Sequence, residues 1–188
     1  MLVSGRGSNL EAILRADLEV TLVVSNRPGV RALDVAVAHG VPLRVLRRAD
    51  FADAGVRDRA IGGALEETGV ELAVLAGYDQ VLRAPYFAAF AGRTINIHPS
   101  LLPLHGGAGM LGLAVHRSVL AAGEVETGVT IHEVTADLDA GPILAQARVP
   151  VLPDDDPETL AARVLVVEHR LLVEALGGIT AGAAPRTR

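Results

Sequence analysis

Short apolar segments alternate with helix-length segments along most of the chain, and this alternation limits the possible folds more than any other feature. Runs such as Thr21–Val24 and Leu72–Leu75 are almost wholly apolar, as expected of strands buried on both faces of a parallel sheet. The expected strands are Leu2–Ser4, Glu19–Ser25, Pro42–Leu46, Leu72–Ala76, Thr94–Ile97, Gly128–Val134 and Ile143–Val149. The expected helices are Ser8–Ala16, Val30–His39, Ala54–Thr68, Ala84–Phe90, Leu113–Ala122 and Pro157–Leu176. The pattern predicts an α/β fold with a doubly wound, mostly parallel sheet of about seven strands and helices on both faces.

The last part of the chain departs from the regular alternation. Only the segment Thr135–Gly141 separates the last two expected strands, and a parallel pair needs a linker of about a dozen residues. One late strand is therefore expected to be antiparallel. We find no internal repeat and no linker, so residues 1–176 are predicted to form a single domain. The small and polar tail, residues 177–188, is predicted to be flexible.

The composition excludes several kinds of chemistry. The 188 residues include no cysteine and no lysine, which rules out disulfides, thiolate metal sites, Schiff-base lysines and a P-loop lysine. The histidine spacing does not match a metal site, so no metal is expected. The net charge of −5 provides no general attraction for nucleic acid or an anionic membrane. Without a signal-like segment or a membrane-length apolar run, the protein is expected to be cytoplasmic.

A glycine-rich turn, Ser4–Asn9, joins the first expected strand to the first expected helix. Glycines allow tight backbone conformations, and the free amides at a helix start can cradle a phosphate. The dinucleotide fingerprint needs a third glycine where Leu10 stands, so the turn favours a monophosphate over a dinucleotide. Ser8 and Glu11 also fit a capping box, which is the purely structural interpretation of the same residues.

A second polar cluster is expected at the carboxyl end of the fifth strand. Asn96 and His98 are two residues apart, so on one strand they share a face. An amide donor and a titratable imidazole suit the oxyanion that forms in acyl transfer to an amine. Asp139, in the turn-rich loop Thr135–Pro142, is placed to approach His98 and raise the pKa of its imidazole. In the alternative interpretation, Asp137 and Asp139 only build an Asx-type turn.

Together, the segments Ser4–Leu10, Asn96–Pro103 and Asp137–Pro142 resemble the glycinamide ribonucleotide formyltransferase family. The similarity extends over nearly the whole chain, as far as the helix near Glu168. The resemblance implies a Rossmann-like formyltransferase fold that acts in purine biosynthesis. It also implies 10-formyltetrahydrofolate as co-substrate and the amine of N1-(5-phosphoribosyl)glycinamide as acceptor. Partners would be small molecules rather than nucleic acid or membrane, and the protein a monomer or homodimer.

The resemblance also implies roles for individual residues. Asn96 would bind the formyl oxygen, His98 would act as general acid, and Asp139 would raise the pKa of His98 and organise a water. The residues matching the ribonucleotide site, most of them around its phosphate, are Gly7, Ser8, Asn9, Leu10, Glu11 and Glu168. The residues matching the folate site are Asp79, Gln80, Val81, Leu82, Asn96, Thr135 and Leu138. The amine would attack the formyl carbon directly, without a covalent enzyme intermediate.

Some positions depart from the family pattern. The pair Asp79-Gln80 stands where the family often has Met-Arg, and Ala54 stands where an arginine often contacts folate. The loop Leu104–Gly112 contains four glycines and fits either a mobile lid or a simple turn. His116, on an expected helix, and His132, in an expected strand, are interpreted as structural. The alternative for His132 is that it lines the cleft.

Three other functions remain open from the sequence. A formyltetrahydrofolate hydrolase, or another folate-dependent formyltransferase, would use the same three residues with a different acceptor. A non-catalytic phosphate- or folate-binding module would share the fold without needing Asn96, His98 and Asp139 to converge. A dinucleotide-dependent reductase is disfavoured by Leu10 and by the absence of an acid after the second expected strand.

Overall fold

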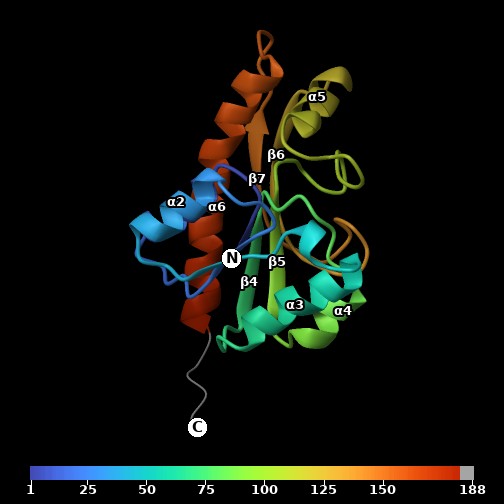
Figure 1. The fold of residues 1–188 in the computed structure, drawn as a ribbon. Coiled ribbons are helices and arrows are strands. Elements are labelled where there is room, and N and C mark those ends of the chain that lie inside the picture. Colours follow the sequence, from blue (N-terminus) through green and yellow to red (C-terminus); the bar gives the residue numbers. More distant parts are fainter. Residues whose placement is uncertain (183–188) are drawn as a thin grey trace.

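The computed structural model describes residues 1–182 and gathers the strands into one seven-stranded sheet of order β3-β2-β1-β4-β5-β6-β7 (Figure 1). Strands β1 to β5 pair in parallel, whereas β6 is antiparallel to both β5 and β7. The prediction of a mostly parallel sheet with a late antiparallel strand is therefore confirmed. The strands are β1 (Leu2–Val3), β2 (Val23–Ser25), β3 (Leu43–Val45), β4 (Leu72–Ala76), β5 (Arg93–His98), β6 (Glu126–Glu133) and β7 (Ile143–Pro150).

Helices cover both faces of the sheet (Figure 1). They are α1 (Ser8–Arg15), α2 (Arg31–Ala38), α3 (Ala54–Glu66), α4 (Ala84–Ala89), α5 (Leu113–Ala121) and α6 (Pro157–Gly182), with a 3₁₀ turn, Arg48–Asp50, that was not predicted. Helix α6 continues beyond its expected end at Leu176, and residues 183–188 of the expected tail lie outside the described residues. Within residues 1–182, no helix is long and apolar enough to cross a membrane.

Two apolar cores, one on each face, explain why the central strands are apolar throughout. Val23 packs into the core formed with α1, α2, α5 and α6. Its neighbour Val24 packs into the core formed with α3 and α4. Val74 and Leu75 of β4 divide between the two cores in the same way. Successive strand residues point to opposite faces, so a sheet covered on both sides buries every position of such a strand.

The glycine turn brings the chain close to α2 before α1 begins. Gly7 is the N-cap of α1 in a left-handed conformation with φ 75°. A Cβ on Gly7 would lie 2.6 Å from Cα of Ala32, so the close approach excludes any side chain. The capping-box prediction is wrong, because Gly7 occupies the N-cap and no side chain caps the helix. Glu11 instead forms ion pairs with Arg15 and Arg31.

A buried ion pair connects α3 to the segment that follows β4. The Arg57 guanidinium donates to Asp58 Oδ1 through Nε at 3.0 Å and Nη2 at 2.6 Å. The two side chains are only 1% and 0% exposed. Arg57 Nη1 also donates to Gln80 Oε1 at 2.9 Å, and the backbone N–H of Arg83 donates to Asp58 Oδ2 at 3.0 Å. The pair thus fixes both ends of the segment 80–83.

Candidate active site

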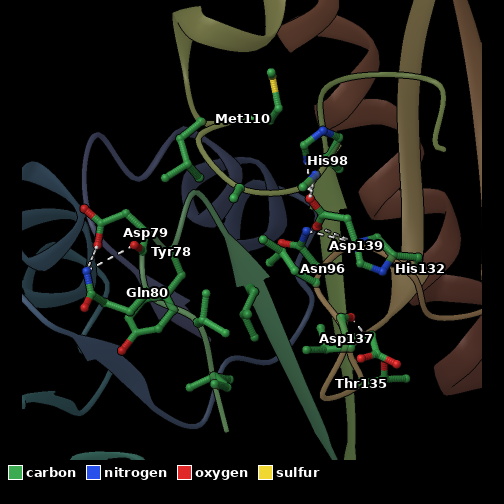
Figure 2. Close-up of a pocket in the computed structure, with 18 of the residues that line it drawn as sticks. Tyr78, Asp79, Gln80, Asn96, His98, Met110, His132, Thr135, Asp137 and Asp139 are labelled. Atoms are coloured by element: carbon green, nitrogen blue, oxygen red, sulfur yellow. Dashed lines mark hydrogen bonds and ion pairs between the residues drawn. The ribbon is translucent and has the colours of Figure 1, made fainter. Parts of the chain in front are cut away.

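Two cavities meet at the carboxyl end of β5. The smaller, of about 280 Å³, lies between the segment Tyr78–Leu82 and the loop Thr135–Asp139, which face each other in Figure 2. The larger, of about 550 Å³, extends from the glycine turn to α6. Asn96 and His98 line both cavities, as does Met110 of the loop Leu104–Gly112. Groups bound in the two cavities would therefore meet beside Asn96 and His98.

His98 is held in one orientation by a backbone carbonyl. Its side chain is buried, and ring atom Nε2 lies 2.9 Å from the carbonyl oxygen of His105. Because a carbonyl can only accept, Nε2 carries a proton and donates it. In the neutral imidazole, Nδ1 is then the free acceptor, and it lies 3.8 Å from Oδ2 of Asp139.

Asp139 is held beside His98 by a second backbone group of the loop Leu104–Gly112, the N–H of Gly107. The N–H of Gly107 donates to Asp139 Oδ2 at 2.8 Å, and Oδ1 lies 3.6 Å from Nε2 of His132 (Figure 2). Burial acts to raise the pKa of Asp139, but the nearby His132 imidazole, the bond from the Gly107 N–H and the nearby His98 imidazole together hold it below its usual value. Asp139 is therefore a carboxylate at neutral pH.

Asp139 acts on the pKa of His98 in the predicted direction, upward, but the net pKa of His98 lies below its ordinary value. Burial lowers the pKa of His98 by disfavouring the charged imidazolium. The His105 carbonyl and Asp139 act in the opposite direction but do not offset the burial. His132 and His105 lower the value further. At pH 7 the imidazole of His98 is therefore mainly neutral.

We expect the His98 imidazole to titrate with a midpoint below 6.5, its ordinary value, in the ligand-free protein. Because the pKa of His98 is lowered in the folded protein, its ring stays neutral until the pH falls to that lower value. Acidification below the midpoint protonates Nδ1, which can then no longer accept a proton. An NMR titration of the His98 Cε1–H resonance measures this directly. In Asp139→Asn the midpoint should move lower still, because the carboxylate that favours the imidazolium is gone. A wild-type midpoint above 6.5 would contradict this account of burial.

His132 lines the smaller cavity, so of its two interpretations the cleft-lining one is confirmed and the purely structural one is wrong. It lies opposite Asn96 in the β5–β6 register. Asn96 Nδ2 donates to His132 Nε2 at 3.1 Å, while His132 Nδ1 donates to the carbonyl of Glu133 at 2.8 Å. The sequence offered one signal, since Thr130 and His132 are polar residues two apart, on either side of the apolar Ile131. The register that places His132 against Asn96 cannot be obtained from that signal.

The glycine turn supplies one end of the larger cavity. Gly7, Ser8 and Asn9 line it, whereas the Leu10 side chain is fully buried in the core. The Glu11 amide already donates to the Gly7 carbonyl within α1, and the Glu11 carboxylate pairs with arginines on the surface. The amides available to a ligand are therefore those of the first turn before Glu11.

Two further titratable groups line the larger cavity. Burial raises the pKa of Glu168 to about 7, although the Asn9 amide, which donates to its carboxylate at 3.2 Å, and the Arg6 charge act to lower it. His116 on α5 is also buried, and its Nδ1 has no hydrogen-bond partner among the described residues. Burial and nearby His98 lower the pKa of His116. Within residues 1–182, no cluster of three potential ligands could hold a metal.

The smaller cavity has partly exposed apolar walls. Val81 is 42% exposed and Leu138 is 44% exposed, which leaves apolar surface for a flat ligand. Leu82 and Thr135 also line this cavity.

Asp79 and Gln80, which depart from the family pattern, are engaged with the protein itself. The Asp79 carboxylate accepts from Ser4 and Asn26 and pairs with Arg27, and the Gln80 amide accepts from buried Arg57.

Comparison with known proteins identifies the family. A family model described as formyl transferase matches residues 1–176. The chain belongs to this formyl transferase family. It is 35% identical to the phosphoribosylglycinamide formyltransferase of Haemophilus influenzae, over 97% of this chain and 86% of that protein. It is 41% identical to the trifunctional purine biosynthetic protein adenosine-3 of Drosophila melanogaster, over 98% of this chain. The formyltransferase chain spans only 14% of that longer protein.

Solved structures agree with this assignment. Glycinamide ribonucleotide transformylase 1 from Symbiobacterium toebii superposes with a TM-score of 0.90 at 37% identity, covering 98% of this chain and 89% of that chain. Phosphoribosylglycinamide formyltransferase from Brucella melitensis gives a TM-score of 0.86 at 42% identity, covering 99% and 96%. The Rossmann-like formyltransferase fold implied by the sequence resemblance is therefore confirmed.

Proposed function

We propose that this formyltransferase transfers the formyl group of 10-formyltetrahydrofolate to the amine of N1-(5-phosphoribosyl)glycinamide in purine biosynthesis. The observation that supports this most strongly is the meeting of two chemically different cavities beside Asn96, His98 and Asp139. The names of the similar proteins support the choice of acceptor. Both substrates are small molecules, and action in the cytoplasm as a monomer or homodimer is part of the same proposal.

The larger cavity suits the phosphorylated acceptor. The uncapped start of α1 offers free amides of Ser8, Asn9 and Leu10, and the helix dipole adds a favourable field for a phosphate. Glu168 and Asn9 lie on the same cavity wall and can hydrogen-bond the hydroxyl groups of a ribose. An acceptor anchored in this way extends toward His98 and presents its amine there.

The smaller cavity suits the donor. Its apolar walls at Val81 and Leu138 can enclose the flat heterocycle of a folate, and the backbone of the segment 79–82 can bond its polar edge. Because the Asp79 and Gln80 side chains already have partners in the protein, we assign the folate contacts of these two residues to their backbone. The formyl group would then lie next to Asn96.

The geometry supports direct attack of the amine on the formyl carbon. As the new C–N bond forms, the carbonyl oxygen becomes an oxyanion, and the second Nδ2 hydrogen of Asn96 can donate to it. Neutral His98 accepts the proton of the attacking amine at Nδ1, and Asp139 stabilises the imidazolium. The imidazolium then protonates N10 of the folate as the old C–N bond breaks. His98 is thus the general acid of the second step after serving as the base of the first.

The proposal is tested by mixing the purified enzyme with 10-formyltetrahydrofolate and following loss of the formyl group with and without glycinamide ribonucleotide. We expect loss only when the ribonucleotide is present. Loss at the same rate without it would identify a hydrolase. A folded protein that catalyses no loss in either case would contradict the proposal and favour a binding module or another acceptor.

A further inference from the structure

The carbonyl that orients His98 belongs to a residue in an unusual conformation. His105 has φ 54°, in the left-handed region that residues other than glycine rarely adopt. Such a conformation is strained and persists only where the surroundings enforce it. In this conformation the His105 carbonyl lies 2.9 Å from Nε2 of His98.

Contacts with α5 and with Glu124 hold the side chain of His105 in place. Its Nδ1 hydrogen-bonds Oγ of Ser118 on α5 at 2.8 Å, and its Nε2 lies 3.6 Å from Oε1 of Glu124, just beyond that helix. The preceding peptide is fixed separately, because Ser100 Oγ donates to the Leu104 carbonyl at 2.7 Å. The contacts of the His105 side chain with Ser118 and Glu124, called the clamp below, therefore mainly set the orientation of the next carbonyl, that of His105.

We propose that Ser118 and Glu124, acting through His105, hold the His98 imidazole in the tautomer that leaves Nδ1 free to accept a proton beside Asp139. Ser118 and His105 are positioning residues, since neither side chain needs to touch substrate. The catalytic consequence rests on the proposed function, whereas the orientation of His98 does not.

The hydrogen bond from His98 Nε2 to the His105 carbonyl also affects the pKa of His98. A carbonyl acceptor at Nε2 favours the protonated imidazole, so loosening it lowers the pKa of His98 further. It also allows the proton to move to Nδ1, which removes the acceptor that faces Asp139. The titratable side chains that shift the pKa of His98 are Asp139, His132 and His105, and His98 in turn lowers the pKa of His116.

The test compares Ser118→Ala with two matched variants. Alanine removes the hydroxyl but suits a helix, so α5 should form normally. Ser118→Thr keeps the hydroxyl and should restore the wild-type behaviour. Arg117→Ala alters a neighbouring exposed residue on α5 and serves as the control. His105→Asn provides a second test, because asparagine tolerates the left-handed conformation but is too short to reproduce the clamp.

We expect Ser118→Ala and His105→Asn to lower kcat by about 10- to 100-fold, with KM for both substrates nearly unchanged. In ¹⁵N-labelled protein the His98 Nε2–H signature should weaken and the imidazole should titrate at a lower pH. The NMR measurement needs no substrate, so it tests the clamp even if the proposed function fails. Variants that match Arg117→Ala in both tautomer and titration would overturn the proposal, as would a fall in kcat that leaves both unchanged.

Discussion

Replacing His98 with alanine should lower kcat by ~10²–10⁴-fold, the usual contribution of a positioned acid–base group. His98 lies where the two cavities meet, and its Nδ1 is free in the neutral ring. Without it the attacking amine loses the imidazole that accepts its proton at Nδ1, and N10 of the folate, left unprotonated, is a poor leaving group. KM for both substrates should change little, because in our proposal the phosphate and the heterocycle bind away from His98, one in each cavity.

The measurement is kcat and both KM values for His98→Ala, with His39→Ala as the control. His39 ends α2, where Nδ1 contacts the carbonyl of Val35, and it lines neither cavity within the described part of the chain. A loss of less than tenfold in kcat for His98→Ala would show that another group carries the proton. A large rise in KM with unchanged kcat would make His98 a binding residue.

Replacing Asp58 with alanine should lower the free energy of unfolding by about 3–5 kcal/mol, the usual result of removing one partner of a buried ion pair. The Arg57 guanidinium would remain in the interior with no opposite charge, since both side chains are essentially unexposed. The Arg83 amide would also lose its acceptor. Urea denaturation of the wild type and the variant measures the difference.

Two further variants distinguish the destabilisation caused by the unpaired buried charge from a general loss of stability. Glu67→Ala breaks the ion pair with Arg44, whose side chains are 65% and 45% exposed, and should cost less than about 1 kcal/mol. The double variant Arg57→Met with Asp58→Leu removes both charges and should recover most of the stability. If Asp58→Ala costs no more than Glu67→Ala, the pair does not stabilise the fold as described.

The architecture was predictable because the pattern of apolar residues indicates which strands are buried on both faces of the sheet. Strands such as β4 are buried on both faces, as expected for a parallel sheet covered by helices on each side. The antiparallel pairing of β6 followed from a linker too short for a crossover. Details that depend on one residue were less predictable. The capping box failed because Gly7 takes the N-cap in a left-handed conformation, leaving Ser8 one position late.

The candidate site was only partly predictable. The spacing of Asn96 and His98 places both on one face of a strand end, and the structure brings Asp139 to His98. Two properties were not accessible from the sequence. The contact between His132 and Asn96 depends on the β5–β6 register. The direction of the His98 pKa shift depends on how fully the ring is buried, and burial outweighs the neighbouring carboxylate.

In the proposed reaction, the two cavities bring a folate and an amine together so that one formyl group passes between them. The most direct measurement follows a ¹³C-labelled formyl carbon by NMR, starting from labelled 10-formyltetrahydrofolate with glycinamide ribonucleotide and the enzyme. We predict that the label appears as a formamide on the ribonucleotide, in equal amount to the tetrahydrofolate released. Label recovered as free formate, with the ribonucleotide unchanged, would contradict the account.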